Sequence, residues 1–166
     1  MNRRNFMIAA AAVVAVPMLA SRLRARESVA VAEGSGGKFA LSDAEWRDKL
    51  SALQYRILRE EGTERAWTSD LLKEKREGTY HCVGCDQALF TSETKYDSRT
   101  GWPSFFDVID GAVGTRRDFK LVLPRTEYHC SRCGGHHGHV FNDGPKPTGL
   151  RYCNNGAVLR FAPTAD

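Results

Sequence analysis

The chain has 166 residues, of which 42% are hydrophobic, and its formal net charge is +4. This length and hydrophobic content fit one domain with its own core plus a tail. The net positive charge comes from residues 1–32, which hold five arginines and one glutamate, so the net charge of the rest of the chain is zero. Because a neutral domain lacks the basic patch of a nucleic-acid binder, we expect no nucleic-acid partner.

The first 32 residues are typical of an export signal. Arg3 and Arg4 precede an alanine-rich run that is too short to span a membrane. The pattern resembles the twin-arginine export signal, and a small-residue cleavage site ends at Ala32. We therefore expect residues 1–32 to direct export to the periplasm, with no stable membrane insertion after cleavage. A retained membrane anchor is the alternative, and residues 33–38 are predicted to be a flexible linker.

Helix signals follow the linker. Ser42 can cap a helix, and Glu45, three residues later, completes a capping box. Apolar residues then recur at helical spacing as far as Gly62, which predicts one helix over this stretch. The recurring residues are Trp46, Leu50, Leu53 and Ile57. Residues 69–77 predict a second short helix that is closed by Gly78.

After Gly78 the chain is typical of an antiparallel β domain. Short segments rich in β-branched and aromatic residues alternate with turn signals. The predicted strands are 79–82, 88–90, 105–109, 119–123, 128–130, 139–141 and 157–161. The fold class is therefore mainly β, with short helices at the N-terminal end.

Two C-x-x-C pairs predict one structural zinc ion. The expected ligands are Cys82, Cys85, Cys130 and Cys133. Four thiolates in two such pairs form the closed tetrahedral set of a structural zinc site. Two disulfides are the alternative in an exported protein. His81 and His129, which each precede a pair, are alternative ligands of a mixed site.

The fifth cysteine, Cys153, has no obvious partner and is the candidate nucleophile. Arg151, two residues away, favours its thiolate, which is the reactive form. If this segment is a strand, Arg151, Cys153 and Asn155 project from one face. His136 and His139 can supply protons from elsewhere in the chain. An inert core cysteine is the alternative, since free cysteine is often buried as a small apolar residue.

Several stretches of the sequence resemble the methionine-(R)-sulfoxide reductase B family. The first is C-G-G-H-H-G-H-V-F-N-D-G-P-K-P-T-G-L-R-Y-C-N-N, residues 133–155. The others are K-Y-D-S-R-T-G-W-P-S-F (95–105), L-Q-Y-R-I-L-R-E-E-G-T-E-R (53–65) and both C-x-x-C pairs. The resemblance covers about Asp43 to Phe161, so residues 39–166 are expected to form the reductase domain.

The resemblance implies a fold of two antiparallel sheets, the β-tent, with the four-cysteine zinc site found in part of the family. It implies an enzyme that repairs oxidised proteins or free methionine sulfoxide under oxidative stress. In that reaction Cys153 attacks the sulfoxide sulfur and becomes a sulfenic acid. His136, His139 and Asn155 match groups that position the substrate and protonate its oxygen. Trp102 matches the ring that holds the S-methyl group, and Arg151 matches the residue that favours the thiolate.

The sequence departs from the family pattern at Thr100, where many members carry a resolving cysteine. We therefore expect an external, thioredoxin-like thiol to reduce the enzyme. We also expect a monomer.

Two other functions compete with this one. A non-catalytic zinc-ribbon interaction module would need the C-x-x-C pairs but not Trp102, His139, Asn155 or Cys153. A thiol peroxidase would not need Trp102.

Overall fold

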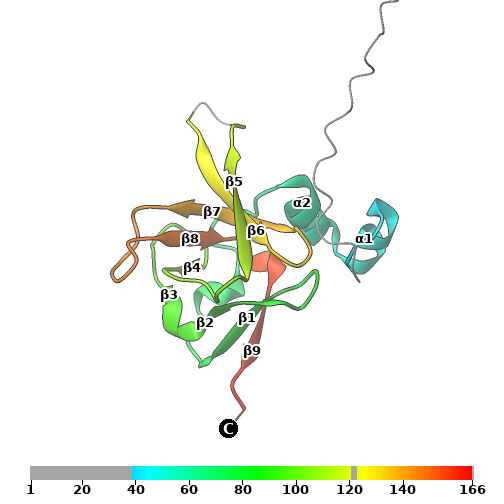
Figure 1. The fold of residues 1–166 in the computed structure, drawn as a ribbon. Coiled ribbons are helices and arrows are strands. Elements are labelled where there is room, and N and C mark those ends of the chain that lie inside the picture. The colour runs from blue at the N-terminus through cyan, green and yellow to red at the C-terminus, as the bar shows by residue number, and fades with distance from the viewer. Residues whose placement is uncertain (1–38, 121–122, 166) are drawn as a thin grey trace, which may run out of the picture. The chain divides into compact units, whose positions relative to one another are not determined.

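The structure, a computed structural model, describes residues 39–120 and 123–165 (Figure 1). The predicted export signal of residues 1–32 and the predicted linker of residues 33–38 lie outside the described residues. Among the helices of the described ranges, none has the length and apolar character needed to cross a membrane.

The strands form two antiparallel sheets, which confirms the predicted fold class (Figure 1). The smaller sheet has the order β2-β1-β9, and the larger has the order β3-β4-β8-β7-β6-β5. The smaller sheet consists of β1 (Gly78–Cys82), β2 (Ala88–Thr91) and β9 (Leu159–Pro163). The larger consists of β3 (Lys95–Tyr96), β4 (Ser104–Phe105), β5 (Val113–Asp118), β6 (Arg125–Cys130), β7 (His136–Phe141) and β8 (Arg151–Asn154).

Aromatic side chains from both sheets form the core between them. Tyr80 of β1, Phe90 of β2, Phe105 of β4 and Tyr128 of β6 are all fully buried. The Phe90 and Phe105 rings stack with their centroids 4.1 Å apart, and the Tyr80 ring meets Phe105 edge-on at 4.9 Å. Because such rings bury large areas and prefer these geometries, they fix one sheet against the other.

The N-terminal helical region contains two helices where the sequence predicts one. Helix α1 spans Asp43–Lys49 and α2 spans Ala52–Glu60, and Leu50 between them is extended. The predicted capping box of Ser42 and Glu45 is present in α1. A second box, in which Ser51 and Gln54 bond each other's backbone, starts α2. This local side-chain capping competes with continuation of the first helix, so the apolar repeat is broken and Leu53 is 41% exposed.

The second predicted helix, over residues 69–77, is wrong. Only Asp70–Leu72 forms a 3-10 turn (η1), which Ser69 caps. Gly78 does not close a helix but begins β1, where a Cβ atom would lie 2.2 Å from the Ala162 carbonyl oxygen. The glycine therefore permits close approach of two strands.

Three predicted strands also differ from the structure. Residues 157 and 158 of the predicted strand 157–161 lie in a 3-10 turn (η3, Gly156–Val158), so β9 begins only at Leu159. Residues 105–109 contribute only the end of β4. Of the predicted strand 119–123, residues 121–122 lie outside the described residues, and the described residues 119, 120 and 123 are not in a strand because β5 ends at Asp118. Asp118 Oδ1 accepts a hydrogen bond from the Lys120 backbone N–H, a turn that terminates the strand. Strand β5 shows no apolar alternation in the sequence, because its residues are exposed or half-buried and several carry a charge.

Candidate active site and zinc site

The four C-x-x-C cysteines come together at the ends of two hairpins. Cys82 ends β1 and Cys130 ends β6, so each pair occupies the turn that follows a strand. The four sulfur atoms lie within 4.8 Å of one another. The Cys82–Cys133 and Cys85–Cys130 sulfur pairs are 3.7 and 3.4 Å apart. A tetrahedron with Zn–S bonds of about 2.3 Å has sulfur–sulfur edges of about 3.8 Å, so the donor set fits zinc.

This cluster confirms the predicted four-cysteine zinc site, and the two alternatives are not supported. All four cysteines have free sulfurs rather than disulfides. His81 Nδ1 lies 3.1 Å from the Asp86 carbonyl oxygen, and His129 Nδ1 lies 3.1 Å from a Glu127 carboxylate oxygen. Both histidines therefore have partners away from the sulfur cluster. When bound, zinc would tie the β1–β2 hairpin to the β6–β7 hairpin.

Cys153 lies in the middle of the larger sheet, on β8 between β4 and β7. Across these two strand pairs it is the register partner of Ser104 and of His139. Directly opposed residues of neighbouring strands have their side chains on the same face, with Cβ atoms about 5 Å apart. The close approach of β7 requires Gly138, because a Cβ atom there would lie 1.9 Å from the Cys153 carbonyl oxygen.

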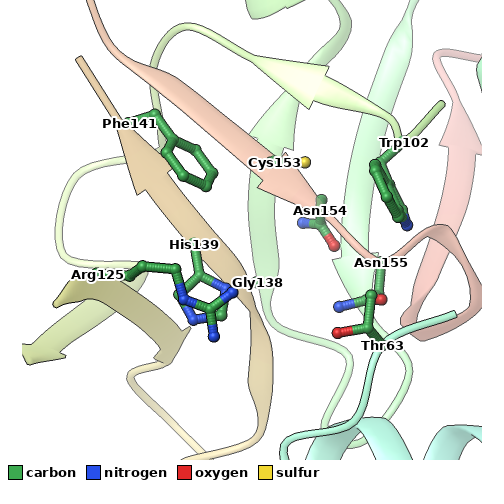
Figure 2. A pocket seen from close by; sticks show the side chains of 9 residues that line it. All are labelled: Thr63, Trp102, Arg125, Gly138, His139, Phe141, Cys153, Asn154 and Asn155. Atoms are coloured by element: carbon green, nitrogen blue, oxygen red, sulfur yellow. The ribbon is translucent and has the colours of Figure 1, made fainter. Parts of the chain in front are cut away.

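A pocket of about 130 Å³ opens beside Cys153 (Figure 2). In this view Cys153 lies between Phe141 and Trp102, with His139 and Arg125 on the Phe141 side. The lining residues are Thr63, Trp102, Arg125, Gly138, His139, Phe141, Cys153, Asn154 and Asn155. Four of the predicted site residues are therefore brought together here: Trp102, His139, Cys153 and Asn155. The pocket is large enough for the end of one side chain.

Two predicted residues, Arg151 and His136, do not line this pocket. The Arg151 guanidinium makes a two-point ion pair with Asp143, at 2.8 Å for each bond, and lies 4.2 Å above the Phe141 ring. The ring of buried His136 lies 5.5 Å from that of His139. His136 therefore contacts a pocket residue without lining the pocket, and Arg151 lies two residues from Cys153 on β8.

The environment of Cys153 holds its sulfur in the thiol form. Burial raises the pKa of the Cys153 thiol, and this outweighs the opposing effects of the Arg151 charge and of hydrogen bonding to Thr100 and Arg151. Arg151 therefore does favour the thiolate, but its charge is shared with Asp143. A resting thiol can keep its proton until a substrate enters the pocket.

The pKa shift predicts a pH profile for alkylation. We expect iodoacetamide to modify Cys153 slowly at neutral pH and faster as the pH rises, because the thiolate is the reactive form. Arg151→Met removes the stabilising cation, so the pKa should rise further and the rate at a fixed pH should fall by up to about tenfold. Arg160→Met is the matched control, because Arg160 pairs with exposed Asp86. A Cys153 pKa below that of an ordinary cysteine would contradict the burial argument.

The sequence did not indicate the partners of His139. Its Nε2 lies 2.7 Å from Asp118 Oδ2, and Arg125 donates to the same oxygen at 2.6 Å. The Asp118 carboxylate also accepts the Lys120 backbone N–H, and these contacts hold its pKa well below the usual range. Burial lowers the pKa of His139, and the bond to Asp118 opposes this effect. The ring is therefore neutral at rest and oriented by a carboxylate.

The partner of His136 is a second carboxylate. His136 Nδ1 lies 2.8 Å from Glu127, a fully buried residue that also receives the Arg116 guanidinium at 3.0 Å. Although burial would raise the pKa of Glu127, hydrogen bonds from His129 and His136 and the charge of Arg116 lower it to about 2. This network joins β5, β6 and β7 through the buried Glu127 carboxylate.

Asn155 and Trp102 are joined by a residue that the sequence reading missed, Glu64. The Glu64 backbone N–H donates to Asn155 Oδ1 at 2.9 Å, and its carbonyl oxygen accepts Trp102 Nε1–H at 3.3 Å. Asn155 Nδ2 donates to the His137 carbonyl oxygen, so both ends of this buried amide bond the backbone. One N–H of the Asn155 amide remains for a ligand.

Glu64 itself is buried, and its carboxylate accepts the backbone N–H groups of Gly156 at 2.6 Å and Ala157 at 2.8 Å. Burial raises its pKa, and these two hydrogen bonds oppose the rise. Glu64 follows the Gly62-Thr63 pair, and an isolated acidic residue in a loop carries no pattern that would have revealed this role. Through these contacts it positions the Trp102 and Asn155 sides of the pocket.

The fold and the site together define a class: a zinc-binding β protein with one cysteine outside the metal cluster, set in a small aromatic pocket with an oriented histidine. Comparison with known proteins agrees. Residues 50–163 match the family model described as the SelR domain.

Two bacterial relatives are each named "Peptide methionine sulfoxide reductase MsrB". The chain is 54% identical to the protein of Leptospira interrogans over 72% of its own length and 92% of the relative. It is 52% identical to the protein of Agrobacterium fabrum over 74% of its own length and 91% of that relative. "Peptide methionine sulfoxide reductase B1, chloroplastic" of Oryza sativa is 50% identical over 75% of this chain and 59% of that protein. The chain therefore belongs to the methionine sulfoxide reductase B family, as its resemblance predicts.

Proposed function

We propose that this chain is an oxidoreductase that reduces methionine (R)-sulfoxide, free or in proteins, with Cys153 as nucleophile. The observation that carries the proposal is the placement of the one cysteine outside the zinc cluster. Cys153 lines a pocket whose other walls include an aromatic ring, Trp102, and an oriented histidine, His139. Family membership supports the reduction of methionine sulfoxide in general.

The atoms and electrons of the reaction balance within the pocket. The Cys153 sulfur attacks the sulfoxide sulfur and forms a sulfur–sulfur bond. The oxygen then passes to the cysteine sulfur, and both the sulfur–sulfur bond and the sulfur–oxygen bond of the substrate break. Thiol plus sulfoxide become sulfenic acid plus thioether, so Cys153 is oxidised by two electrons and the substrate is reduced by two. The developing charge on the oxygen needs a proton donor, which His139 can supply. The Trp102 ring suits an S-methyl group, since sulfur contacts with aromatic rings are favourable.

The alternative, a non-catalytic zinc-ribbon module, needs only the metal cluster. It leaves unexplained why the structure builds a second site on β7 and β8 from residues outside the C-x-x-C pairs. Turnover distinguishes the two functions, because a module has none.

The direct test is reduction of separated methionine sulfoxide epimers with dithiothreitol as electron donor. We expect turnover of the R epimer and turnover at least about 10²-fold slower for the S epimer, because a rigid pocket places only one epimer's oxygen toward the proton donor. Hydrogen peroxide serves as the control substrate, since a thiol peroxidase would reduce it without using Trp102. Equal rates for both epimers, or reduction of peroxide alone, would contradict the proposal.

We also propose a one-cysteine catalytic cycle, reset by an external thioredoxin-like thiol. The other four cysteines belong to the zinc cluster, so Cys153 has no second thiol within the chain. Thr100 stands where a resolving cysteine is found in many relatives, and its hydroxyl is bonded to Ser98 Oγ at 2.8 Å. A sulfenic acid at Cys153 should therefore persist until an outside thiol attacks it.

Mass spectrometry after one turnover without reductant tests the cycle. We expect one added oxygen on Cys153, trapped as its dimedone adduct. In Thr100→Cys we expect a disulfide between the introduced thiol and Cys153 instead, because many relatives carry their resolving cysteine at this position. Thr100→Ser is the matched control and should still show the sulfenic acid. An intramolecular disulfide between Cys153 and a zinc ligand in the unmodified chain, with zinc released, would contradict the proposal.

We further propose that the protein is exported and acts outside the inner membrane. The support is the twin arginine, Arg3 and Arg4, ahead of the alanine-rich run. In that oxidising compartment the external thiol must draw its electrons across the membrane. N-terminal sequencing of the exported protein checks cleavage after Ala32, and an intact N-terminus in the cytoplasm would refute it.

A further inference from the structure

The structure assigns a positioning role to Asp118: we propose that its carboxylate holds His139 in the tautomer that shuttles the proton of the reaction. This inference rests on the proposed function, because it deals with the proton that the sulfoxide oxygen needs. Asp118 ends β5, two strands away from His139 on β7, with β6 between them. No sequence motif connects the two residues.

The geometry fixes which ring nitrogen carries the proton. A carboxylate only accepts hydrogen bonds, so at 2.7 Å from Asp118 Oδ2 the neutral ring must be protonated at Nε2. The Nδ1 atom is then left to receive a proton. The side chains of Asp118 and His139 are 8% and 13% exposed, so solvent competes little for this bond.

Asp118 is itself held in place from two further directions. Arg125, on the intervening strand, donates to the same carboxylate oxygen at 2.6 Å, and the Lys120 backbone N–H bonds the other oxygen at 2.8 Å. Asp118 and Arg125 are also register partners in the β5–β6 ladder. These two donors hold the carboxylate in place independently of His139, which is the requirement for a group that orients another.

The surroundings of His139 show why its imidazolium form needs a negatively charged partner. The titratable and charged groups that face it are Asp118 from β5, Arg125 and Glu127 from β6, His136 from β7 and Cys153 from β8. Burial disfavours the imidazolium, as does the positive charge of Arg125. Within the part of the chain that the structure describes, Asp118 is the close group whose bond favours the charged ring.

These observations combine into one proton path. The thiol proton of Cys153 passes to Nδ1 of neutral His139 as the sulfur attacks, and the imidazolium is stabilised by Asp118. His139 then gives this proton to the oxygen that leaves the substrate, so the proton ends on the sulfenic acid. No proton is gained or lost overall. Asp118 touches neither substrate nor sulfur, so it is a positioning residue rather than a catalytic one.

The first test reads the tautomer without using activity. In the wild-type holoprotein, ¹⁵N chemical shifts of the His139 ring should show the Nε2–H tautomer at neutral pH, with the signal assigned by its loss in His139→Asn. A proton on Nδ1 would overturn the proposal. This measurement uses the wild type, so it is valid even if an Asp118 variant fails to fold. It also needs no activity. If the protein turns over neither epimer, the proposed function is refuted and the tautomer result is unaffected.

The second test is Asp118→Asn. We expect the His139 pKa to fall, because the carboxylate that favours the imidazolium is lost. The kcat for methionine (R)-sulfoxide should fall by about 10- to 100-fold, within the range of acid–base catalysis, and KM should change little. Asp118→Glu keeps the charge and should recover most of the lost rate.

The matched control is Asp97→Asn. Asp97 is exposed and also accepts the backbone N–H two residues later, from Arg99 at 2.9 Å, but it has no histidine partner among the described residues. The Asp97→Asn substitution should leave kcat and the ¹⁵N chemical shifts of His139 unchanged. Wild-type kcat in Asp118→Asn would overturn the proposal. So would a loss of activity that follows zinc loss or melting while the His139 pKa is unchanged, because the role would then be only structural.

Discussion

Replacing Cys153 with serine is expected to abolish sulfoxide reduction while leaving the fold and the zinc in place. A serine hydroxyl is a far weaker nucleophile than a cysteine sulfur at neutral pH, and it cannot form a sulfenic acid. We expect kcat/KM to fall by at least about three orders of magnitude. The measurement is turnover of the R epimer with dithiothreitol in excess.

The fold should survive this change because serine is nearly isosteric with cysteine and Cys153 is only half-buried. Its neighbours on β4 and β7 bond the β8 backbone, and serine leaves that ladder intact. Zinc content and the midpoint of thermal unfolding provide the controls. Substantial activity in a zinc-loaded Cys153→Ser protein would mean that another group is the nucleophile.

The second large effect is expected from Cys130→Ser, which should lose zinc and unfold. Cys130 is completely buried at the end of β6, and its sulfur lies 3.4 Å from that of Cys85. Metal binding at a structural zinc site contributes roughly 10 kcal/mol or more to folding. That is comparable to the whole net stability of a typical domain, about 5–15 kcal/mol. The measurement is zinc per chain together with far- and near-ultraviolet circular dichroism.

Cys153→Ser is the matched control for this variant, because the chemical change is the same and only the location differs. The two variants should separate the two sites: one loses activity and keeps zinc, and the other loses zinc first. A folded, active Cys130→Ser protein without metal would show that the cluster is not needed for the scaffold. Zinc that is absent from the wild type, with two intact disulfides instead, would refute the metal site itself.

The sequence alone was sufficient for features that depend on spacing and residue type. The two C-x-x-C pairs identified the zinc ligands because a tetrahedral thiolate site needs four cysteines and tolerates any length of chain between the pairs. Counting then left Cys153 unpaired. The Ser42–Glu45 capping box was also readable, since its hydrogen bonds join residues three apart. Each of these signals is local or purely compositional.

The wrong predictions of helices and strands rest on local sequence patterns that neighbouring side chains override. The single predicted helix divides at Leu50 because Ser51 starts a new capping box. Strand β5 was missed because a solvent-exposed strand carries charges instead of alternating apolar residues. The segment 119–123 has the composition of a strand, yet the Asp118–Lys120 turn ends β5 before it, and Phe119 is 72% exposed.

The sequence by itself therefore determined the zinc ligands, the unpaired Cys153 and the mainly β class. Only the tertiary structure decided what each pocket residue does. Glu64 bonds Asn155 and Asp118 bonds His139 across long stretches of the chain, and Arg125 lines the pocket beside them. Arg151 shares its charge with Asp143, and burial dominates the pKa of Cys153. The physical reason is that ionisation and orientation depend on which charges, dipoles and apolar groups surround a side chain, and antiparallel pairing assembles those neighbours across strands.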